Sequence, residues 1–311
     1  MPSDAAQTVA EFRRYAEVIR GLLRSGGVFV PEAESATVVQ VERGVVFAQA
    51  IVDARGVDQQ AAARLIELAF NDRLSSIAVV DRSGHHRPVY RGLLVYSWLQ
   101  AFGLVYEMLS QTDFGRWEEG LRPWCDLLES ELGQIEWPAS QPMPAGRGSS
   151  ATESAWIALA LHVAGKRFVR DAWTDLASDT FGKLVRSQNL IGTGSFLLAS
   201  ASDNPETHWY HELVLLHAAA SYAVQAEDRT LAGAVAQNAE FHQQQTQPDH
   251  ATTQPWAAFA FVWNPNTRLL AEQVLHAATV RPSGVLDGVS LMLLADALYC
   301  LELFTTAPSR Q

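Results

Sequence analysis

Cysteine is scarce in this chain, and long apolar runs are missing. Cys125 and Cys300 are the two cysteines among 311 residues. Each lies in an apolar helical pattern, so we expect buried free thiols rather than a disulfide framework. No run of about 18 apolar residues occurs, and the N-terminus lacks the basic and then apolar segments of a secretory signal. We therefore expect a soluble protein of the reducing cytoplasm.

Positive charge is also in short supply. The chain has 23 Lys and Arg residues against 34 Asp and Glu residues, for a formal net charge of −11. No basic stripe is present to neutralise phosphates, which disfavours nucleic acid as a partner. An acidic surface likewise disfavours binding to an anionic membrane. We expect a small polar ligand as the partner, with 48% hydrophobic residues providing a normal globular core.

The familiar nucleophile and phosphate-binding motifs are absent. There is no Gly-x-Ser-x-Gly sequence, which would mark the nucleophile of an α/β-hydrolase. Residues 192–195 read Gly-Thr-Gly-Ser, but they lack the lysine and the preceding strand of a phosphate-binding loop. The sequence therefore names no reaction by motif.

Helical periodicity dominates what is present. Apolar residues at spacings of three and four predict helices over 5–24, 58–72, 88–110, 114–132, 150–164, 168–187, 205–226, 229–245, 255–263, 266–279 and 285–304. Residues 36–52 fit a helix or a strand, and we favour a helix. Residues 75–81 favour a short β element. The Pro-, Gly- and Ser-rich segment 136–149 either separates two subdomains or forms a long loop in one helical domain spanning 1–311.

Very apolar helices recur, each preceded by a polar segment and followed by a more amphipathic helix. The polar segments carry capping chemistry, such as Asn204 before Pro205 and a capping box formed by Ser150 and Glu153. A helix that is apolar all round must be buried on every side. The alternation predicts consecutive helix hairpins with inner and outer helices. An α-solenoid needs the same unit, but the uneven repeat spacing favours a closed α/α toroid.

In this alternation the chain resembles the α/α-toroid folds, which include the six-hairpin glycosidases and the terpenoid cyclase and prenyltransferase group. The resemblance covers about residues 85–304 and is one of architecture. Neither the Asp-x-Asp-Asp acid motif nor the Asp-Asp-x-x-Asp metal motif occurs in the chain. The resemblance therefore implies a fold and transfers no catalytic residue.

In a toroid the N-terminal ends of the inner helices would meet at one rim, where unpaired amides favour an anion or a polar ligand. His208, His211 and Glu212 are three and four residues apart, so they share one side of a helix. Asp249 and His250 lie together between two helices. We predict Asp249, His250, His211 and Glu212 as acid/base residues, and we predict as ligand-binding residues Trp256, Trp209, His208, Thr252, Thr253 and Arg87. His217 lies on an apolar face and is interpreted as a core histidine with hydrogen-bond partners.

Three functions fit these features. The first is an enzyme or binding protein for a sugar or another small polar molecule, acting at the rim of the toroid. The second is a non-catalytic helical scaffold, which would present a large groove to a protein partner and no pocket with converging polar groups. The third is a metal-dependent enzyme with His208, His211 and either Asp249 or His250 as ligands.

Overall fold

The structure is a computed structural model. It describes residues 4–25, 27–28, 78–80, 86–88, 90–105, 111–138, 140–144, 147–199, 205–245, 254–280, 285–286 and 288–306. The helices expected over 36–52 and 58–72 lie outside these ranges. Every other predicted helix coincides with a helical segment of the structure, with shifts of a few residues at the ends.

The described chain is all-α. Its α-helices are α1 (Asp4–Ser25), α4 (Arg91–Val105), α5 (Gln111–Gln134), α6 (Gly148–Phe168), α7 (Asp171–Ile191), α8 (Pro205–Gln225), α9 (Arg229–Gln244), α11 (Ala258–Trp263), α12 (Arg268–Thr279) and α13 (Gly288–Thr306). Two short 3₁₀ turns, η3 (Pro255–Ala257) and η4 (Pro265–Thr267), precede α11 and α12. None of the described helices has the length and apolar character needed to span a bilayer.

Two pairs of very short strands accompany the helices. Strand β1 (Gly27–Val28) runs parallel to β4 (Val285–Leu286). Strand β2 (Ala78–Val80) pairs antiparallel with β3 (His86–Pro88), and Ala78 lies opposite Pro88. Strand β2 falls inside the 75–81 segment for which the sequence favours a β element. Each strand is only two or three residues long, so these pairs contribute little to a fold made of helices.

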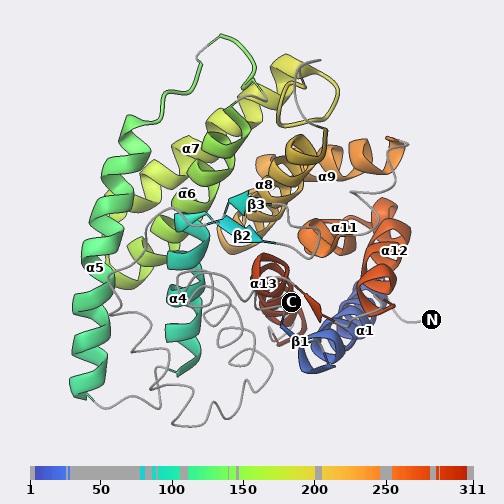
Figure 1. The fold of residues 1–311 in the computed structure, drawn as a ribbon, viewed down its shortest axis with the longest axis horizontal. Coiled ribbons are helices and arrows are strands. Elements are labelled where there is room, and N and C mark those ends of the chain that lie inside the picture. Colours follow the sequence, from blue (N-terminus) through green and yellow to red (C-terminus); the bar gives the residue numbers. More distant parts are fainter. Residues whose placement is uncertain are drawn as a thin grey trace.

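The apolar helices pack on one another and the amphipathic helices cover them. Helix α6 contacts α4 and α8, α8 contacts α11 and α13, and α11 contacts α13. Helices α5 and α7 pack on α6, α9 packs on α8, α12 packs on α11, and α1 packs on α13. In Figure 1 the amphipathic set lies farther from the middle of the view than the apolar set. The two cysteines, Cys125 and Cys300, are buried free thiols, as predicted.

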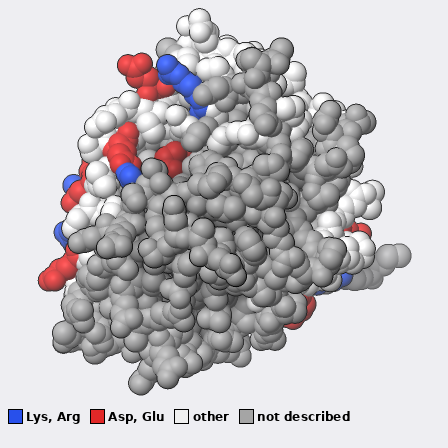
Figure 2. All heavy atoms as spheres, in the orientation of Figure 1, with Lys and Arg blue, Asp and Glu red and all other residues white. Residues whose placement is uncertain are grey.

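On the face drawn in Figure 2, the described acidic and basic side chains lie beside one another along the edges of the view. Some charged side chains of the described residues form ion pairs across helices, such as Arg170 with Asp126 at 2.7 Å and Arg14 with Glu272 at 2.6 Å. These are exposed pairs, so each contributes only about 0–1 kcal/mol to stability. They give the described surface a mixed character without making it a binding site.

The capping box predicted for α6 is wrong. Helix α6 begins at Gly148, so Ser150 lies inside it rather than at its N-cap. Glu153 instead serves the neighbouring helix, because its carboxylate accepts the backbone N–H groups of Arg91 at 3.1 Å and Gly92 at 3.0 Å. These are the first N–H groups of α4, which have no partner within their own helix. Glu153 therefore caps α4 across the α4–α6 contact.

The α4–α6 contact also requires a glycine. A Cβ atom on Gly92 would lie 2.3 Å from the backbone nitrogen of Ile157 and 2.5 Å from the carbonyl carbon of Trp156. Both atoms belong to the backbone of α6, which cannot move aside as a flexible side chain would. The absence of a side chain at position 92 thus sets how closely these two helices approach.

Overpacking a well-packed contact commonly costs about 1–3 kcal/mol, and the rigid backbone of α6 cannot relax to reduce this cost. We therefore predict that Gly92→Ala lowers the free energy of unfolding by about 3 kcal/mol or more. Urea unfolding followed by circular dichroism measures this. The matched control is Gly21→Ala in α1, where an added Cβ meets no atom within 4 Å. That control should gain about 0.5–1 kcal/mol from helix propensity. Equal stability of the two variants would contradict the predicted contact.

Candidate functional site

The residues predicted from the sequence divide into two groups. His208, Trp209, His211 and Glu212 lie in the first two turns of α8, and Trp256 lies in η3. Asp249, His250, Thr252 and Thr253 lie outside the described residues. Arg87 is part of β3, and its side chain is not among the described ones. The predicted pairing of Asp249 with His250 therefore stays a prediction.

Glu212 is fully buried and its carboxylate holds a loop. One oxygen accepts the backbone N–H of Phe196 at 2.7 Å and the side chains of Ser195 at 2.9 Å and Asn238 at 2.7 Å. The other oxygen accepts the N–H of Leu197 at 3.0 Å. Burial raises the pKa of Glu212 to about 7, against the opposing effect of these hydrogen bonds. The side chain thus fastens residues 195–197 to α8 and α9.

His211 points to a different neighbour. Its Nδ1 atom is hydrogen-bonded to the hydroxyl of Tyr90, just before α4. Burial, with a smaller effect of His208, lowers the pKa of His211 to about 4. His211 and Glu212 are thus both buried but are engaged by separate groups, so the described contacts join no histidine–carboxylate pair here.

Trp256 and His242 are two further buried residues that pack against the N-terminal part of α8. Trp256 is fully buried, so neither face of its indole is open to solvent, and it packs edge-on against Tyr210 with ring centroids 4.9 Å apart. His242 of α9 is buried beside Trp209 at 5.3 Å, and neither of its ring nitrogens has a hydrogen-bond partner among the described residues. Burial and then His208 lower the pKa of His242 to about 3.

Metal-ligand geometry is not found in the described part of the chain. No group of three or more His, Cys, Asp or Glu side chains there is arranged to hold a metal ion. The metal site hypothesised from the sequence needs Asp249 or His250 as well as His208 and His211. Because the first two lie outside the described residues, that hypothesis stays a prediction.

A cavity of about 720 Å³ lies at the other end of the apolar helices. Ligand sites commonly fall within about 300–1,000 Å³. Side chains from the C-terminal halves of α4, α6, α8 and α13, and from the turn after α8, line it. The polar and charged members are Gln100, His162, Lys166, Arg167, Gln225, Glu227 and Tyr299. The apolar members are Val163, Val224, Leu303 and Phe304.

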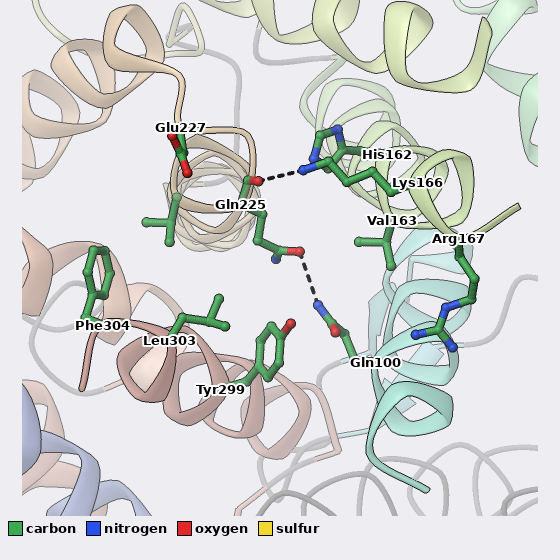
Figure 3. A pocket seen from close by; sticks show the side chains of 11 residues that line it. Gln100, His162, Val163, Lys166, Arg167, Gln225, Glu227, Tyr299, Leu303 and Phe304 are labelled. Atoms are coloured by element: carbon green, nitrogen blue, oxygen red, sulfur yellow. Dashed lines mark hydrogen bonds between the residues drawn. The ribbon is translucent and has the colours of Figure 1, made fainter. Parts of the chain in front are cut away.

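Figure 3 shows how the lining is divided. His162, Lys166 and Arg167 of α6 lie on one side, and Leu303 and Phe304 of α13 lie on the other. Lys166 donates to the backbone carbonyl of Gln225 at 2.9 Å, so it caps the C-terminal end of α8. The arrangement brings hydrogen-bonding groups from four helices around one space.

A buried hydrogen-bond network begins directly behind this cavity. The side-chain amides of Gln100 and Gln225 both donate to the hydroxyl of Tyr96, at 2.8 and 2.7 Å. Tyr96 in turn donates to Asp296 of α13 at 2.5 Å. Its hydroxyl therefore uses one hydrogen and two lone pairs, which is its full capacity. Because the hydrogen is given to Asp296, the two glutamines must present their N–H groups to Tyr96.

His217 and Asp296 form the centre of the network, and both are fully buried. His217 Nε2 lies 2.9 Å from Asp296 Oδ2, and Nδ1 lies 3.1 Å from the carbonyl oxygen of Trp256. A carbonyl can only accept, so Nδ1 carries a hydrogen. A second hydrogen must then lie between Nε2 and Oδ2, which makes the two residues a proton-sharing pair. Ser221 also donates to Oδ2. The interpretation of His217 as a core histidine with partners is confirmed.

This cavity and the residues behind it are not among the sites predicted from the sequence. One signal was available: Asp296 interrupts an otherwise apolar stretch of α13, and a carboxylate on a helix that is buried all round requires partners. The cavity residues carry no such signal, because they come from four helices that are far apart in the sequence and form no local motif.

Comparison with known proteins found no match for this chain, whether among protein-family models, curated proteins or solved structures.

The low pKa of His242 predicts acid sensitivity. An imidazole titrates near pH 6.5 when unfolded and at about 3 here, so between these values the unfolded state binds more protons and stability falls as pH falls. Relative to His242→Phe, the parent should lose about 3 kcal/mol of unfolding free energy from pH 7 to pH 4. Urea unfolding at each pH measures this, with the exposed His276→Phe as control. Parallel pH curves for the parent and His242→Phe would refute the prediction.

The His217–Asp296 pair predicts strong coupling. Asp296→Leu alone and His217→Leu alone should each cost about 3–5 kcal/mol, because each leaves a buried polar partner behind. The double variant should cost at least about 2 kcal/mol less than the sum of the two single losses. The control cycle, Asp179→Ala with Lys183→Ala, removes an exposed pair of 2.6 Å and should show coupling below about 1 kcal/mol. Additive losses for His217 and Asp296 would contradict the shared proton.

Proposed function

We propose that this protein binds a small polar molecule in the cavity at the C-terminal ends of α4, α6, α8 and α13, as an enzyme or as a binding protein. The observation that carries the proposal is convergence. Amides, a phenol, an imidazole, cations and a carboxylate meet around one space of ligand size. Apolar side chains of α6, α8 and α13 supply the remaining wall.

The buried network supports the same proposal. A proton-sharing pair in an apolar core is more costly than well-packed apolar side chains of the same volume. Here the pair is connected, through Tyr96, to the two amides that line the cavity. Gln100 and Gln225 are the members of the network that line the cavity. A role in holding these two amides in place accounts for the network better than stability alone does.

We further infer that α4, α6, α8, α11 and α13 form the inner helices of an α/α toroid. The succession of contacts from α4 to α6, α8, α11 and α13 supports this arrangement, as does the cover provided by α5, α7, α9, α12 and α1. The hydrogen bond from Tyr96 to Asp296 adds a link between the first and last members. In such a fold the cavity would lie at the C-terminal ends of the inner helices. The site predicted from the sequence would lie at the opposite rim, which the N-terminal ends of these helices form.

The convergence of polar groups counts against the scaffold hypothesis, which requires a broad groove and no such pocket.

The acid/base role proposed for His211 and Glu212 is disfavoured, since both side chains are buried and hydrogen-bonded to other groups of the protein. Asp249 and His250 remain candidates at that rim. The metal-dependent alternative also remains a proposal, and metal analysis of the purified protein tests it.

A thermal-shift screen tests the binding proposal. The parent protein is screened against sugars, polyols, amino acids, hydroxy acids and phosphorylated metabolites. Each stabilising compound is then tested on Leu303→Trp, in which an indole fills part of the cavity. We expect at least one compound whose stabilisation is lost in this variant, because only a ligand bound to the folded cavity raises the melting temperature in this way.

The matched control is Leu269→Trp on α12. Leu269 is 63% exposed, lies outside the cavity lining and undergoes the same substitution. It should keep every shift seen in the parent, and circular dichroism confirms that both variants fold. If no compound distinguishes Leu303→Trp from Leu269→Trp, the cavity is not the binding site and the proposal fails.

A further inference from the structure

The cavity lining carries opposite charges at two separate places. Lys166 lies in the last turn of α6, and Glu227 lies in the turn between α8 and α9. In Figure 3 Gln225 stands between these two side chains, with Lys166 on one side of it and the carboxylate of Glu227 on the other. A ligand that meets both charges must therefore hold its own positive and negative groups apart, with an uncharged part between them.

The Lys166 side chain is held in place by the fold and still has hydrogens to donate. Its ammonium group carries three N–H groups, and one of them is donated to the backbone carbonyl of Gln225 at 2.9 Å. This bond also offsets the partial negative charge at the end of α8. The N–H groups that remain, together with the positive charge, suit a carboxylate.

The Glu227 side chain stands on a turn that is fixed at both ends. The backbone N–H of Asp228, the next residue, is donated to a carbonyl of the last turn of α8 at 3.0 Å. The side chain of Asp228 in turn accepts N–H groups of the first turn of α9. Leu303 and Phe304 of α13 line the same space, and in Figure 3 they lie on the same side of Gln225 as Glu227. This side of the cavity therefore suits an ammonium group with an apolar group beside it.

Between the two charges lies a pair of amides whose remaining hydrogen-bonding groups can be counted. Gln100 donates one amide hydrogen to Tyr96 at 2.8 Å and the other to Oε1 of Gln225 at 3.3 Å. What Gln100 offers a ligand is therefore its carbonyl oxygen. Gln225 donates one amide hydrogen to Tyr96 at 2.7 Å and keeps the other. This floor thus presents one acceptor and one donor, both held by the same tyrosine.

A peptide group matches such a floor. It is planar and trans, with the C=O on one edge and the N–H on the opposite edge, so either edge finds a partner among the two amides. A methylene chain in the same place would cover these polar groups without replacing their hydrogen bonds to water, which is costly. Two residues in an extended conformation span about 7 Å, which keeps the terminal charges apart.

We propose that the cavity takes a dipeptide with free termini and an apolar N-terminal side chain. Lys166 binds its carboxylate, Glu227 binds its ammonium group, and the amide of Gln100 or Gln225 binds the peptide group between them. The apolar side chain contacts Leu303 and Phe304 of α13. This inference rests on the proposed function, since it names the class of ligand that the same cavity accepts.

Four probes test the separation of the charges: L-phenylalanyl-L-alanine, its N-acetyl form, its C-terminal amide and L-phenylalanine. The acetyl form lacks the ammonium group, and the amide lacks the carboxylate. In L-phenylalanine both charges share one carbon. Isothermal titration calorimetry gives Kd for each. We expect the dipeptide to bind at least about fivefold more tightly than any of the other three, because it alone reaches both charged side chains.

A second pair of probes tests the peptide group. Glycylglycine and 5-aminopentanoate hold their ammonium and carboxylate groups the same number of bonds apart, but only glycylglycine has an amide in the middle. We expect glycylglycine to bind about fivefold more tightly, because the methylene chain of 5-aminopentanoate leaves the floor amides without a partner. Equal affinities would show that the floor does not recognise a peptide group and would overturn this part of the inference.

Single substitutions assign each charge to its partner. Lys166→Gln should weaken the dipeptide and its N-acetyl form by about fivefold and leave the C-terminal amide unchanged. Glu227→Gln should weaken the dipeptide and its C-terminal amide and leave the N-acetyl form unchanged. Lys183→Gln on α7 is the control, because Lys183 pairs with Asp179 and does not line the cavity. The location is checked with Leu303→Trp, which should weaken the dipeptide, and Leu269→Trp, which should not.

The inference is overturned if the dipeptide does not bind, if any of its three analogues binds as tightly, or if Lys166→Gln and Glu227→Gln affect all probes alike. It is also overturned if dipeptide binding is insensitive to Leu303→Trp. Any of these results can coexist with another compound whose stabilisation is lost in Leu303→Trp. In that case the dipeptide inference falls and the proposed cavity site stands. If no compound at all is sensitive to Leu303→Trp, the proposed function falls as well.

Discussion

The proton shared by His217 and Asp296 is the interaction on which the centre of this molecule depends. A carboxyl group in an apolar core is expensive to bury unless its oxygens are fully hydrogen-bonded. Asp296 meets this requirement with partners on two other helices: Tyr96 of α4, and His217 and Ser221 of α8. His217 is joined in turn to the carbonyl of Trp256 in η3. None of these elements can shift without leaving a buried polar group unpaired. The pair therefore fixes where α4, α8, α13 and η3 lie relative to one another.

The same pair determines what the cavity presents. Because Tyr96 gives its hydrogen to Asp296, its lone pairs select the N–H groups of Gln100 and Gln225. The orientation of two cavity amides is thus set by the hydroxyl hydrogen that Tyr96 donates to Asp296. Rigid polar groups bind a ligand without losing side-chain freedom at the moment of binding. The hydrogen bonds that satisfy Asp296 in the core therefore also orient the amides of the cavity wall.

Periodicity was sufficient to predict the helices of the described residues, because a buried stripe repeats every three to four residues whatever lies opposite it. It could not assign partners across helices. Ser150 and Glu153 fit a local capping box, yet Glu153 caps α4, since the tight approach at Gly92 brings the first turn of α4 to it. The apolar residues around His217 in the sequence were enough to predict a core histidine. The cavity, in contrast, is lined by Gln100, Lys166, Gln225 and Tyr299. The spacing of these residues in the chain does not indicate that they lie close together in the fold. Asp249 and His250 lie beyond what the structure describes.

The two ends of the apolar helices use their polar residues differently. At the N-terminal ends, carboxylates accept hydrogen bonds from backbone N–H groups. Glu153 accepts those of α4, and Glu212 accepts those of residues 196 and 197. For Glu153 this follows from helix geometry, because the first turn of α4 exposes donors that need acceptors, whereas Glu212 satisfies the N–H groups of a loop. At the C-terminal ends the unpaired groups are carbonyls, and Lys166 meets one of them while keeping N–H groups to spare. The Lys166 ammonium is therefore not fully used by the fold, which is the physical reason to place the ligand at that end.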